Sequence, residues 1–369
     1  MMTPMRRMGC VVIAVLTLLS GCSSSSKKVT AANGTSSTAT QHTLSTAGGT
    51  SGACGGLGAA DPAGSVTYVE NNKLYAVSTS GGTPTCLDAD VGSGAPRWNG
   101  DGDKVILPDG RVDRGQGPQA VTTGNPLTLS WSYPHGTAVL QVDQSGKLSW
   151  VPSGGGAPLD ITFLARHDAA IYHPAGTHIV SSGLSKDGTY GLFVATNRGQ
   201  DVRMIVRSET ANSIGQLAWT TNHQLLFVAD HGDHKDLHQF NLATEKLVTV
   251  TQIPASQCFR SVVASRSPGG GVAWSTGACD GSGPAATTAV RSGAFLPLAG
   301  TPLASAQPIG FLPDGTLIGR GSDGVVAFKA GTVSVLHSAN APTALRVPEP
   351  ASPPIELAGI PAVEARAPA

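Results

Sequence analysis

The amino-acid sequence predicts an all-β domain built from one repeated unit. Glycine (47 residues) and proline (25 residues) punctuate the chain, and the segments between them are rich in valine and threonine. No window of 12 residues keeps an apolar face at the i, i+3, i+4, i+7 spacing of a helix. Turn motifs also recur at a nearly constant spacing. Together these observations favour a β-propeller, in which four-stranded blades of about 40–45 residues follow one another around an axis.

Six turn motifs mark the repeat, and successive markers lie 34, 40, 47, 47 and 45 residues apart. The marker positions are Gly102, Gly136, Gly176, His223, Gly270 and Gly315. An aromatic residue lies four positions before four of these markers, at Trp98, Tyr172, Trp219 and Phe311, whereas Trp131 lies one position earlier in its unit and Arg266 replaces the aromatic residue in another. We expect the aromatic side chains to pack between neighbouring blades while each turn sends the chain back as the next antiparallel strand.

The number of blades follows from the two ends of the repeat. Residues 64–90 supply three strands before the first marker, and the run 343–347 is placed to return and add the fourth. Such a closure hides the edges that an open sheet would expose. The sequence therefore predicts about seven blades. Six blades remain the alternative if residues 95–125 are irregular, and a pair of β-sandwiches is the competing architecture.

The turn at Pro313-Asp314-Gly315, which an aromatic residue precedes, and the strand-turn-strand segments 72–87 and 236–251 resemble the TolB-type, WD40-like propeller repeat. The resemblance covers about residues 64–340. It implies a propeller that binds other molecules of the cell envelope. Proteins of the TolB type carry a small α/β domain ahead of the propeller and are soluble. In this chain we expect a lipid anchor and a linker ahead of the propeller instead. The partner of that family, the peptidoglycan-associated lipoprotein, is therefore not carried over.

The N-terminus has the three parts of an export signal. Arg6 and Arg7 are followed by nine mostly apolar residues, 11–19, too few for the roughly 20 that span a bilayer. The stretch ends in Leu19-Ser20-Gly21-Cys22, which resembles the bacterial lipobox. The resemblance implies a lipoprotein signal peptide over residues 1–21, with palmitate and other acyl chains carried on Cys22. We expect a protein anchored by lipid on the extracytoplasmic face of the cell membrane. An ordinary signal peptide is the alternative, and export by either the Sec or the Tat route stays open.

Composition divides the rest of the chain. Residues 22–53 are rich in serine, threonine and glycine and predict a flexible tether, because few large apolar side chains are present to offset the entropy of ordering. Residues 348–369 carry a proline every few positions, which predicts a disordered tail. The propeller domain is expected to span residues 54–347.

Cysteine usage agrees with export into an oxidising compartment. Apart from the signal and Cys22, the chain has Cys54, Cys86, Cys258 and Cys279. Four cysteines permit three pairings. We favour Cys54 with Cys86 and Cys258 with Cys279, because each pair then closes a local loop. The alternative is that one or both pairs stay reduced.

The charge balance of the chain indicates which classes of binding partner to expect. Lysine plus arginine and aspartate plus glutamate each total 24, so the formal net charge is zero, and charged residues are 13% of the chain. Nucleic acids are set aside as partners because phosphate neutralisation needs clustered basic residues. We expect a monomer that contacts the membrane through its lipid and binds an envelope protein or a glycan. No cofactor is expected apart from the covalent lipid on Cys22, and a divalent metal ion at the segment described next is the less favoured alternative.

Residues 230–238, DHGDHKDLH, have a composition that could bind zinc or another divalent ion, through His231, Asp233, His234 and His238. The competing interpretation, which we prefer on sequence alone, is a polar loop between two strands that faces water. In the segment NGDGD, residues 99–103 echo the start of a calcium loop, but the later glutamate is missing and the residues suit a turn.

A rim of histidines is the other candidate site. His135, His173 and His178 lie at or near corresponding turns of successive units and would then surround one rim of the propeller. The sequence contains no HExxH, GxSxG, P-loop or Rossmann motif, and no catalytic residue is assigned. A binding scaffold is therefore the favoured function, and an envelope enzyme, a hydrolase or similar, with a pocket at the propeller channel is the alternative.

Overall fold

A computed structural model describes residues 54–348, apart from positions 62–63, 122–125, 134, 222, 268–269, 292–293, 323 and 339–340, together with residues 363–364. The predicted signal peptide, Cys22 and the predicted tether lie outside the described residues. None of the helices among the described residues is long and apolar enough to cross a membrane. The strands of residues 65–346 form seven antiparallel sheets of four strands each.

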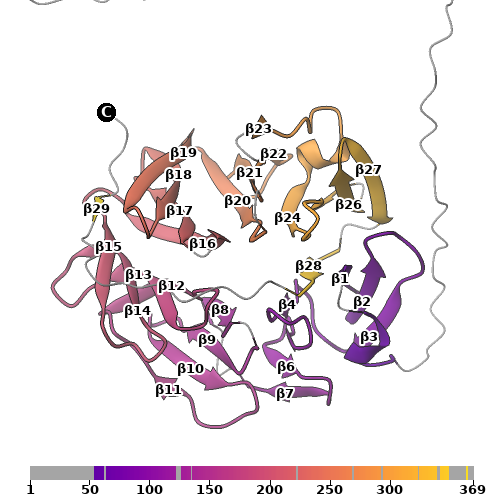
Figure 1. Ribbon diagram of the computed structural model, residues 1–369, viewed down its shortest axis with the longest axis horizontal. Helices are drawn as coiled ribbons and strands as arrows, with labels where there is room; N and C mark the ends of the chain where they lie inside the picture. The colour runs from indigo at the N-terminus through magenta and orange to yellow at the C-terminus, as the bar shows by residue number, and fades with distance from the viewer. Residues whose placement is uncertain are drawn as a thin grey trace, which may run out of the picture. The chain divides into compact units, whose positions relative to one another are not determined.

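Figure 1 shows the seven sheets arranged around a common centre, which is the architecture of a β-propeller. The sheets are numbered here as blades 1–7 in chain order, and within each blade the strands run from the centre outward. Blade 1 consists of β28 (Thr343–Arg346), β1 (Ser65–Glu70), β2 (Lys73–Ser78) and β3 (Thr85–Ala89). Blade 2 consists of β4 (Arg97–Trp98), β5 (Val105–Ile106), β6 (Arg111–Asp113) and β7 (Pro118–Ala120). Blade 3 consists of β8 (Thr128–Trp131), β9 (Ala138–Val142), β10 (Leu148–Pro152) and β11 (Leu159–Asp160).

The other four blades have longer strands. Blade 4 consists of β12 (Arg166–Tyr172), β13 (His178–Leu184), β14 (Tyr190–Thr196) and β15 (Arg203–Arg207). Blade 5 consists of β16 (Ser213–Thr221), β17 (Gln224–Asp230), β18 (His234–Asn241) and β19 (Lys246–Pro254). Blade 6 consists of β20 (Gln257–Ala264), β21 (Gly271–Ala278), β22 (Ala286–Arg291) and β23 (Ala294–Phe295). Blade 7 consists of β24 (Gln307–Phe311), β25 (Leu317–Gly321), β26 (Gly324–Lys329) and β27 (Thr332–His337). Two short 3-10 helices, η1 (Leu57–Ala59) and η2 (Pro302–Ser305), complete the elements.

The ring closes between the two ends of the domain, as the sequence predicts. Strand β28 pairs antiparallel with β1, with Ser65 opposite Arg346 and Tyr68 opposite Thr343. Inner strands contact one another from β8 through β12, β16, β20 and β24 to β28, and β28 contacts β4. Seven blades are therefore confirmed, and both the six-bladed ring and the pair of β-sandwiches are wrong, because residues 97–120 form a regular four-stranded blade.

Arg346 fastens this closure. Its guanidinium donates to the backbone carbonyl oxygens of Gly102, Ala60 and Leu57 at 2.7–3.1 Å, and it lies over the ring of Trp98 at 4.4 Å. The residue is only 2% exposed. A buried charge is tolerated when its hydrogen bonds are satisfied, and here the satisfied donors join the last inner strand to blade 2 and to the N-terminal residues of the domain.

The aromatic residues that precede the turn markers pack between blades, as predicted. The indole N–H of Trp98 donates to Thr67 Oγ1 of blade 1 at 2.7 Å. Trp131 donates to the carbonyl of Arg97 in blade 2 at 2.7 Å, and Trp219 donates to that of Tyr172 in blade 4 at 2.9 Å. Each of these tryptophans therefore fills the space between two blades and satisfies its polar atom on the preceding blade.

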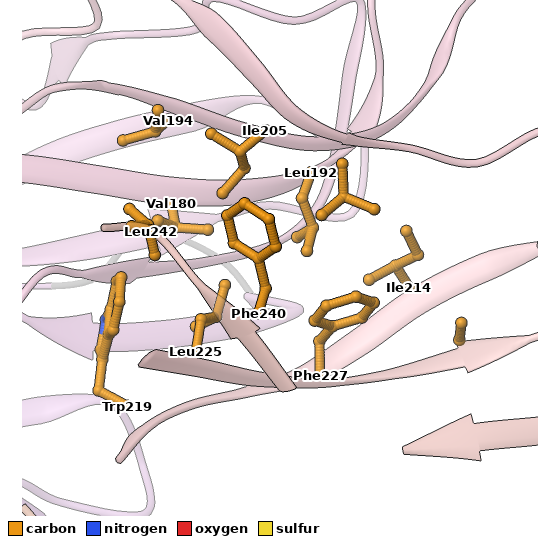
Figure 2. Close-up of a cluster of buried hydrophobic side chains, with 12 residues drawn as sticks. Val180, Leu192, Val194, Ile205, Ile214, Trp219, Leu225, Phe227, Phe240 and Leu242 are labelled. Atoms are coloured by element: carbon orange, nitrogen blue, oxygen red, sulfur yellow. The ribbon is translucent and has the colours of Figure 1, made fainter. Parts of the chain in front are cut away.

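The apolar core is divided among the gaps between blades rather than gathered at one centre. Figure 2 shows the cluster between blades 4 and 5, where Leu192 and Ile205 of blade 4 meet Leu225, Phe227 and Phe240 of blade 5. All five side chains are fully buried. Because a blade can bury its faces only against its neighbours, each blade depends on the next one for its core.

The marker glycine Gly176 shows why a turn of the repeat requires glycine. Gly176 has φ +72°, and a Cβ atom there would lie 2.1 Å from the carbonyl oxygen of Tyr133. In the NGDGD segment, Asn99 donates to Asp103 and accepts from the backbone N–H groups of Asp103 and Lys104. This segment is a tight turn held by its own side chains, in agreement with the turn interpretation.

Two disulfides join the pairs that the sequence favours. Cys54 is bonded to Cys86, and Cys258 is bonded to Cys279, with Cα atoms 4.9 and 4.8 Å apart. The first ties the N-terminal residues of the domain to β3, and the second ties the start of β20 to the residue that follows β21. In the predicted tail, strand β29 (Val363–Glu364) pairs in parallel with β15 at the outer edge of blade 4, and the rest of the tail beyond residue 348 lies outside the described residues.

Candidate functional site

A cavity of about 390 Å³ lies where the inner strands of the blades converge. Each blade contributes one side chain from its inner strand to a ring in its lining. Six of the seven are aliphatic and the seventh is an arginine. In blade order the ring consists of Leu345, Arg97, Leu129, Ile171, Leu217, Val262 and Ile309.

The charged side chains among the described lining residues of this cavity are both arginines. Arg97 donates to the carbonyl oxygen of Leu129 at 2.7 Å, and Arg266 lies over the ring of Tyr133 at 4.7 Å. No aspartate, glutamate or histidine occurs among the described residues that line the cavity. An apolar group that carries a negative charge would therefore meet both aliphatic contacts and guanidinium donors here.

The structure separates the three histidines of the predicted rim. His135 is on the surface, with a side chain 72% exposed, and its Nδ1 lies 2.8 Å from Asp101 Oδ2. His178 is half-buried beside Thr177, and burial lowers the pKa of its imidazole. His173 is fully buried, with its ring edge-on to Trp219, so it is unavailable on any rim. The predicted rim set is wrong for His173, because its side chain is buried against Trp219 of blade 5.

A second candidate lies in residues 230–238, and here our preferred interpretation of a water-facing loop is wrong for most of the segment. Strand β17 ends at Asp230 and β18 begins at His234, so only three residues form the turn. Along β18, His234, Asp236 and His238 alternate onto one face of the sheet. Asp236 and His238 are fully buried. The face that they share also carries Phe240 and meets the apolar cluster between blades 4 and 5.

The polar atoms of this segment converge on one carboxylate. The Nε2 atoms of His231, His234 and His238 each lie 3.7 Å from Oδ2 of Asp236. None of the three Nε2 atoms and neither carboxylate oxygen has a hydrogen-bond partner among the described residues. Burial without hydrogen bonds is costly for such groups, so this cluster is the least satisfied part of the described core.

The other nitrogen of each ring is held by a residue outside the cluster. Nδ1 of His231 lies 2.9 Å from Thr210 Oγ1, and Nδ1 of His238 lies 3.3 Å from Thr249 Oγ1. Nδ1 of His234 lies 2.6 Å from a carboxylate oxygen of Asp233. These contacts orient all three rings so that their Nε2 atoms face inward, as outer-sphere partners do at metal sites.

The structure thus changes the predicted ligand set. His231, His234 and His238 come together as expected, but Asp233 is an exposed partner of His234, and the carboxylate at the centre belongs to Asp236. The signal for Asp236 was present in the sequence as the alternation His234-x-Asp236-x-His238, which places all three side chains on one face if the segment is a strand.

Burial sets the protonation of the cluster. It lowers the pKa of His231, and it lowers that of His238 to about 4, because the apolar surroundings disfavour the charged imidazolium. The hydrogen bond from His234 lowers the pKa of Asp233. Near pH 7 the buried imidazoles His231 and His238 are therefore neutral, which is the form that binds metal ions.

Comparison with known proteins shows a similarity of fold alone. No protein-family model matches the sequence, and no curated protein matches it. The tricorn protease matches with a TM-score of 0.50 at 10% identity, covering 74% of this chain and 33% of that one. Oligogalacturonate lyase in complex with manganese gives 0.49 at 12%, covering 71% and 81%, and TolB from Acinetobacter baumannii gives 0.45 at 15%, covering 63% and 62%. The likeness is one of fold. This chain is a seven-bladed β-propeller of a fold that binding proteins and enzymes share.

Proposed function

We propose that this chain is a lipid-anchored propeller on the extracytoplasmic face of the cell membrane, where it binds an envelope protein or a glycan at its central cavity. The export signal and Cys22 support the location. The seven-bladed ring supports a binding role, because stacked blades bring one inner strand each to a common surface. The observation that carries the proposal is the cavity ring of seven inner-strand side chains, six of them aliphatic and the seventh Arg97.

The chemistry of the cavity indicates what kind of group it receives. Its aliphatic ring favours an apolar group, and Arg97 and Arg266 favour a carboxylate or another anion on the same group. Arg97 donates to a backbone carbonyl oxygen, and no acidic side chain occurs in the described lining, so a ligand anion would bring a negative charge to Arg97. An acidic side chain of a partner protein and a sugar acid both have this chemistry.

An enzyme at the same cavity is the alternative. General acid–base catalysis there requires a side chain such as histidine, aspartate or glutamate within reach of the substrate. The described lining of the cavity offers arginine, tyrosine, serine and aliphatic groups instead. We therefore favour binding over catalysis at this site.

The binding proposal is tested by capture on the immobilised full-length chain. An envelope extract is divided, and one half is treated with protease and the other with glycosidases. We expect Arg97→Gln to retain at least about tenfold less of the captured material, since a charge-assisted hydrogen bond is worth roughly 1.5–3 kcal/mol. Arg198→Gln, an exposed arginine between β14 and β15, is the matched control and should capture as much as the unaltered chain.

Equal capture by Arg97→Gln and the unaltered chain would contradict binding at the cavity. The treated halves show whether the captured material is protein or glycan. The anchor is tested separately by Cys22→Ser, which removes the thiol that carries the acyl chains, each buried CH₂ contributing about 0.8 kcal/mol to membrane binding. We expect this variant to leave the detergent phase, and its persistence there would contradict the lipid anchor.

A further inference from the structure

The cluster in blade 5 is independent of the central cavity. Strand β18 is the third strand from the centre of its blade, whereas the inner strands line the cavity. Three imidazole nitrogens and one carboxylate meet there, and all lack hydrogen bonds among the described residues. The proposed function uses none of these groups, so their convergence calls for a separate explanation.

Hydrogen bonds within the cluster do not explain it. An N–H···O bond spans about 2.7–3.2 Å, and the three Nε2···Oδ2 distances are each 3.7 Å. Nδ1 of His234 faces a carboxylate oxygen of Asp233, which only accepts, so that nitrogen carries the proton. When Nδ1 alone carries a proton, the ring presents a lone pair on Nε2 toward Asp236. Lone pairs of His234 and Asp236 that face each other in a buried site repel unless a cation lies between them.

The spacing suits a metal ion. Tetrahedral zinc has bonds of about 2.0–2.2 Å to nitrogen and oxygen, which place its ligand atoms roughly 3.3–3.6 Å apart. The three Nε2···Oδ2 separations of 3.7 Å exceed this by a few tenths of an ångström, and the ligand atoms of His231, Asp236 and His238 lie within 4.8 Å of one another, up to about 1.2 Å beyond the tetrahedral spacing. The rings of His231 and His234 are stacked with centroids 4.6 Å apart, so one of them, most readily the partly exposed His234, would turn to direct its Nε2 lone pair at the ion, and the other ligands would move inward.

We propose that His231, His234, Asp236 and His238 form a binding site for a divalent first-row transition metal, most favourably zinc, between blades 4 and 5. Imidazole and carboxylate ligands without thiolate suit Zn²⁺ and its neighbours in the first row. Four protein ligands fill a tetrahedral shell, so the ion has a structural role and leaves no open position for substrate. It would tie the β17–β18 turn to the buried face of β18.

The outer contacts complete the site. Thr210 and Thr249 hold the rings of His231 and His238, and Asp233 holds that of His234. Thr210 follows blade 4 in the chain and Thr249 lies on β19, so the ligand rings are held from both sides of β18. Access is from the turn, where His234 is 19% exposed and residues 232–233 are on the surface.

The test uses the full-length chain, freed of metal with a chelator and then loaded with Zn²⁺. Metal content after removal of free ion, by inductively coupled plasma mass spectrometry, should be about one zinc per chain. Asp236→Asn and His238→Gln should weaken zinc affinity by more than the roughly 10–100-fold that loss of an outer partner costs, and Thr249→Val should weaken it within that range. His135→Gln, which alters an exposed His–Asp pair, is the matched control and should bind zinc unchanged.

Two results would overturn the proposal. One is an unaltered chain that keeps no zinc, cobalt or manganese and whose stability falls as the pH rises through the titration of its histidines, which indicates a protonated His–Asp pair. The other is an Asp236→Asn variant with unaltered affinity. If Asp236→Asn or His238→Gln fails to fold by circular dichroism, the partly exposed His234→Gln and Thr249→Val variants decide, since both alter the site with less disturbance of the core.

Discussion

Blades 4 and 5 each bury a histidine, and the difference between the two shows what distinguishes a structural residue from a ligand. In blade 4, Nδ1 of His167 lies 2.7 Å from Ser181 Oγ, and its Nε2 accepts from the N–H of Leu164 at 3.3 Å. In blade 5, His238 has one such partner, Thr249, and its Nε2 faces Asp236 without a hydrogen bond. Both rings are fully buried. Burial alone therefore does not mark a site, whereas converging groups without partners do.

The contrast extends to charge. Burial lowers the pKa of both His167 and His238 to about 4, so both rings are neutral near pH 7. In the neutral ring of His167 both nitrogens have a hydrogen-bond partner. For His238 the neutral ring has a partner at Nδ1 alone, and its Nε2 faces a buried carboxylate at 3.7 Å, a spacing that a bound cation would bridge. Four experiments test this distinction.

Metal loading should give the largest effect. A ligand that binds only the folded chain at about a thousand times its Kd raises the free energy of unfolding by about 4 kcal/mol. For a domain of this size we expect the thermal unfolding midpoint to rise by about 6 °C from the chelated to the zinc-loaded chain. Differential scanning calorimetry measures this. The same midpoint with and without zinc would remove the distinction between the two blades.

Acid should destabilise the chain through His167. The pKa of this ring is about 4 in the folded state and about 6.5 in the unfolded state, so the unfolded chain binds more protons between these values. Stability is therefore fully present above pH 6.5, falls as the pH drops toward 4, and loses about 3 kcal/mol from this residue. Denaturant unfolding of His167→Gln should show a correspondingly smaller loss over this window. An equal loss in both proteins would contradict the assignment.

The effect of Asp236→Asn on the free energy of unfolding should change sign when zinc is bound. In chelator the amide removes a buried charge and supplies a donor to a neighbouring Nε2, so the variant should be more stable than the metal-free chain by about 2–3 kcal/mol. With zinc bound to the unaltered chain, the order should reverse. Urea unfolding in both conditions tests the crossover. A variant that is less stable in both conditions would show that the carboxylate has a partner of its own.

Trp219→Phe should give the smallest effect and serves as a control in the same gap between blades. It removes the hydrogen bond to the carbonyl of Tyr172 and part of the packing, at a cost of about 1–2 kcal/mol. The response to zinc should be unchanged, because Trp219 does not contact the cluster. A lost zinc response in this variant would indicate that the cluster depends on the general packing of blades 4 and 5.

Much of the fold could be predicted from the sequence. The repeat of turn markers established the blades, the unpaired strands of residues 64–90 required a closing strand at 343–347, and Trp98 and Trp219 lie between blades as expected. These features depend on local turns and on a spacing that is visible along the chain. The pairing of Cys258 with Cys279 also follows from proximity in the chain.

The sites were harder to predict because they depend on register and on facing blades. Residues 230–238 have the composition of a loop, and only the pairing of β18 with β17 and β19 shows that Asp236 and His238 point into the core. Likewise, His173 follows an inner strand at a turn, as a rim residue would, and only the facing blade shows that its ring is buried against Trp219. Arg97 and Ile171 lie one position before their aromatic residues, whereas Leu129, Leu217 and Ile309 lie two positions before theirs, so the repeat indicates the inner strands of the cavity but not which side chain of each strand faces it.

The most direct test of the central claim, that the blade 5 cluster requires a cation, is a crystal structure of the zinc-loaded chain with data collected on both sides of the zinc absorption edge. We predict one anomalous peak among the Nε2 atoms of His231, His234 and His238 and the carboxylate of Asp236, at about 2.0–2.2 Å from each ligand atom. His167 should show no peak. An ordered cluster without a peak, in which an imidazole donates a hydrogen bond to Asp236, would contradict the claim.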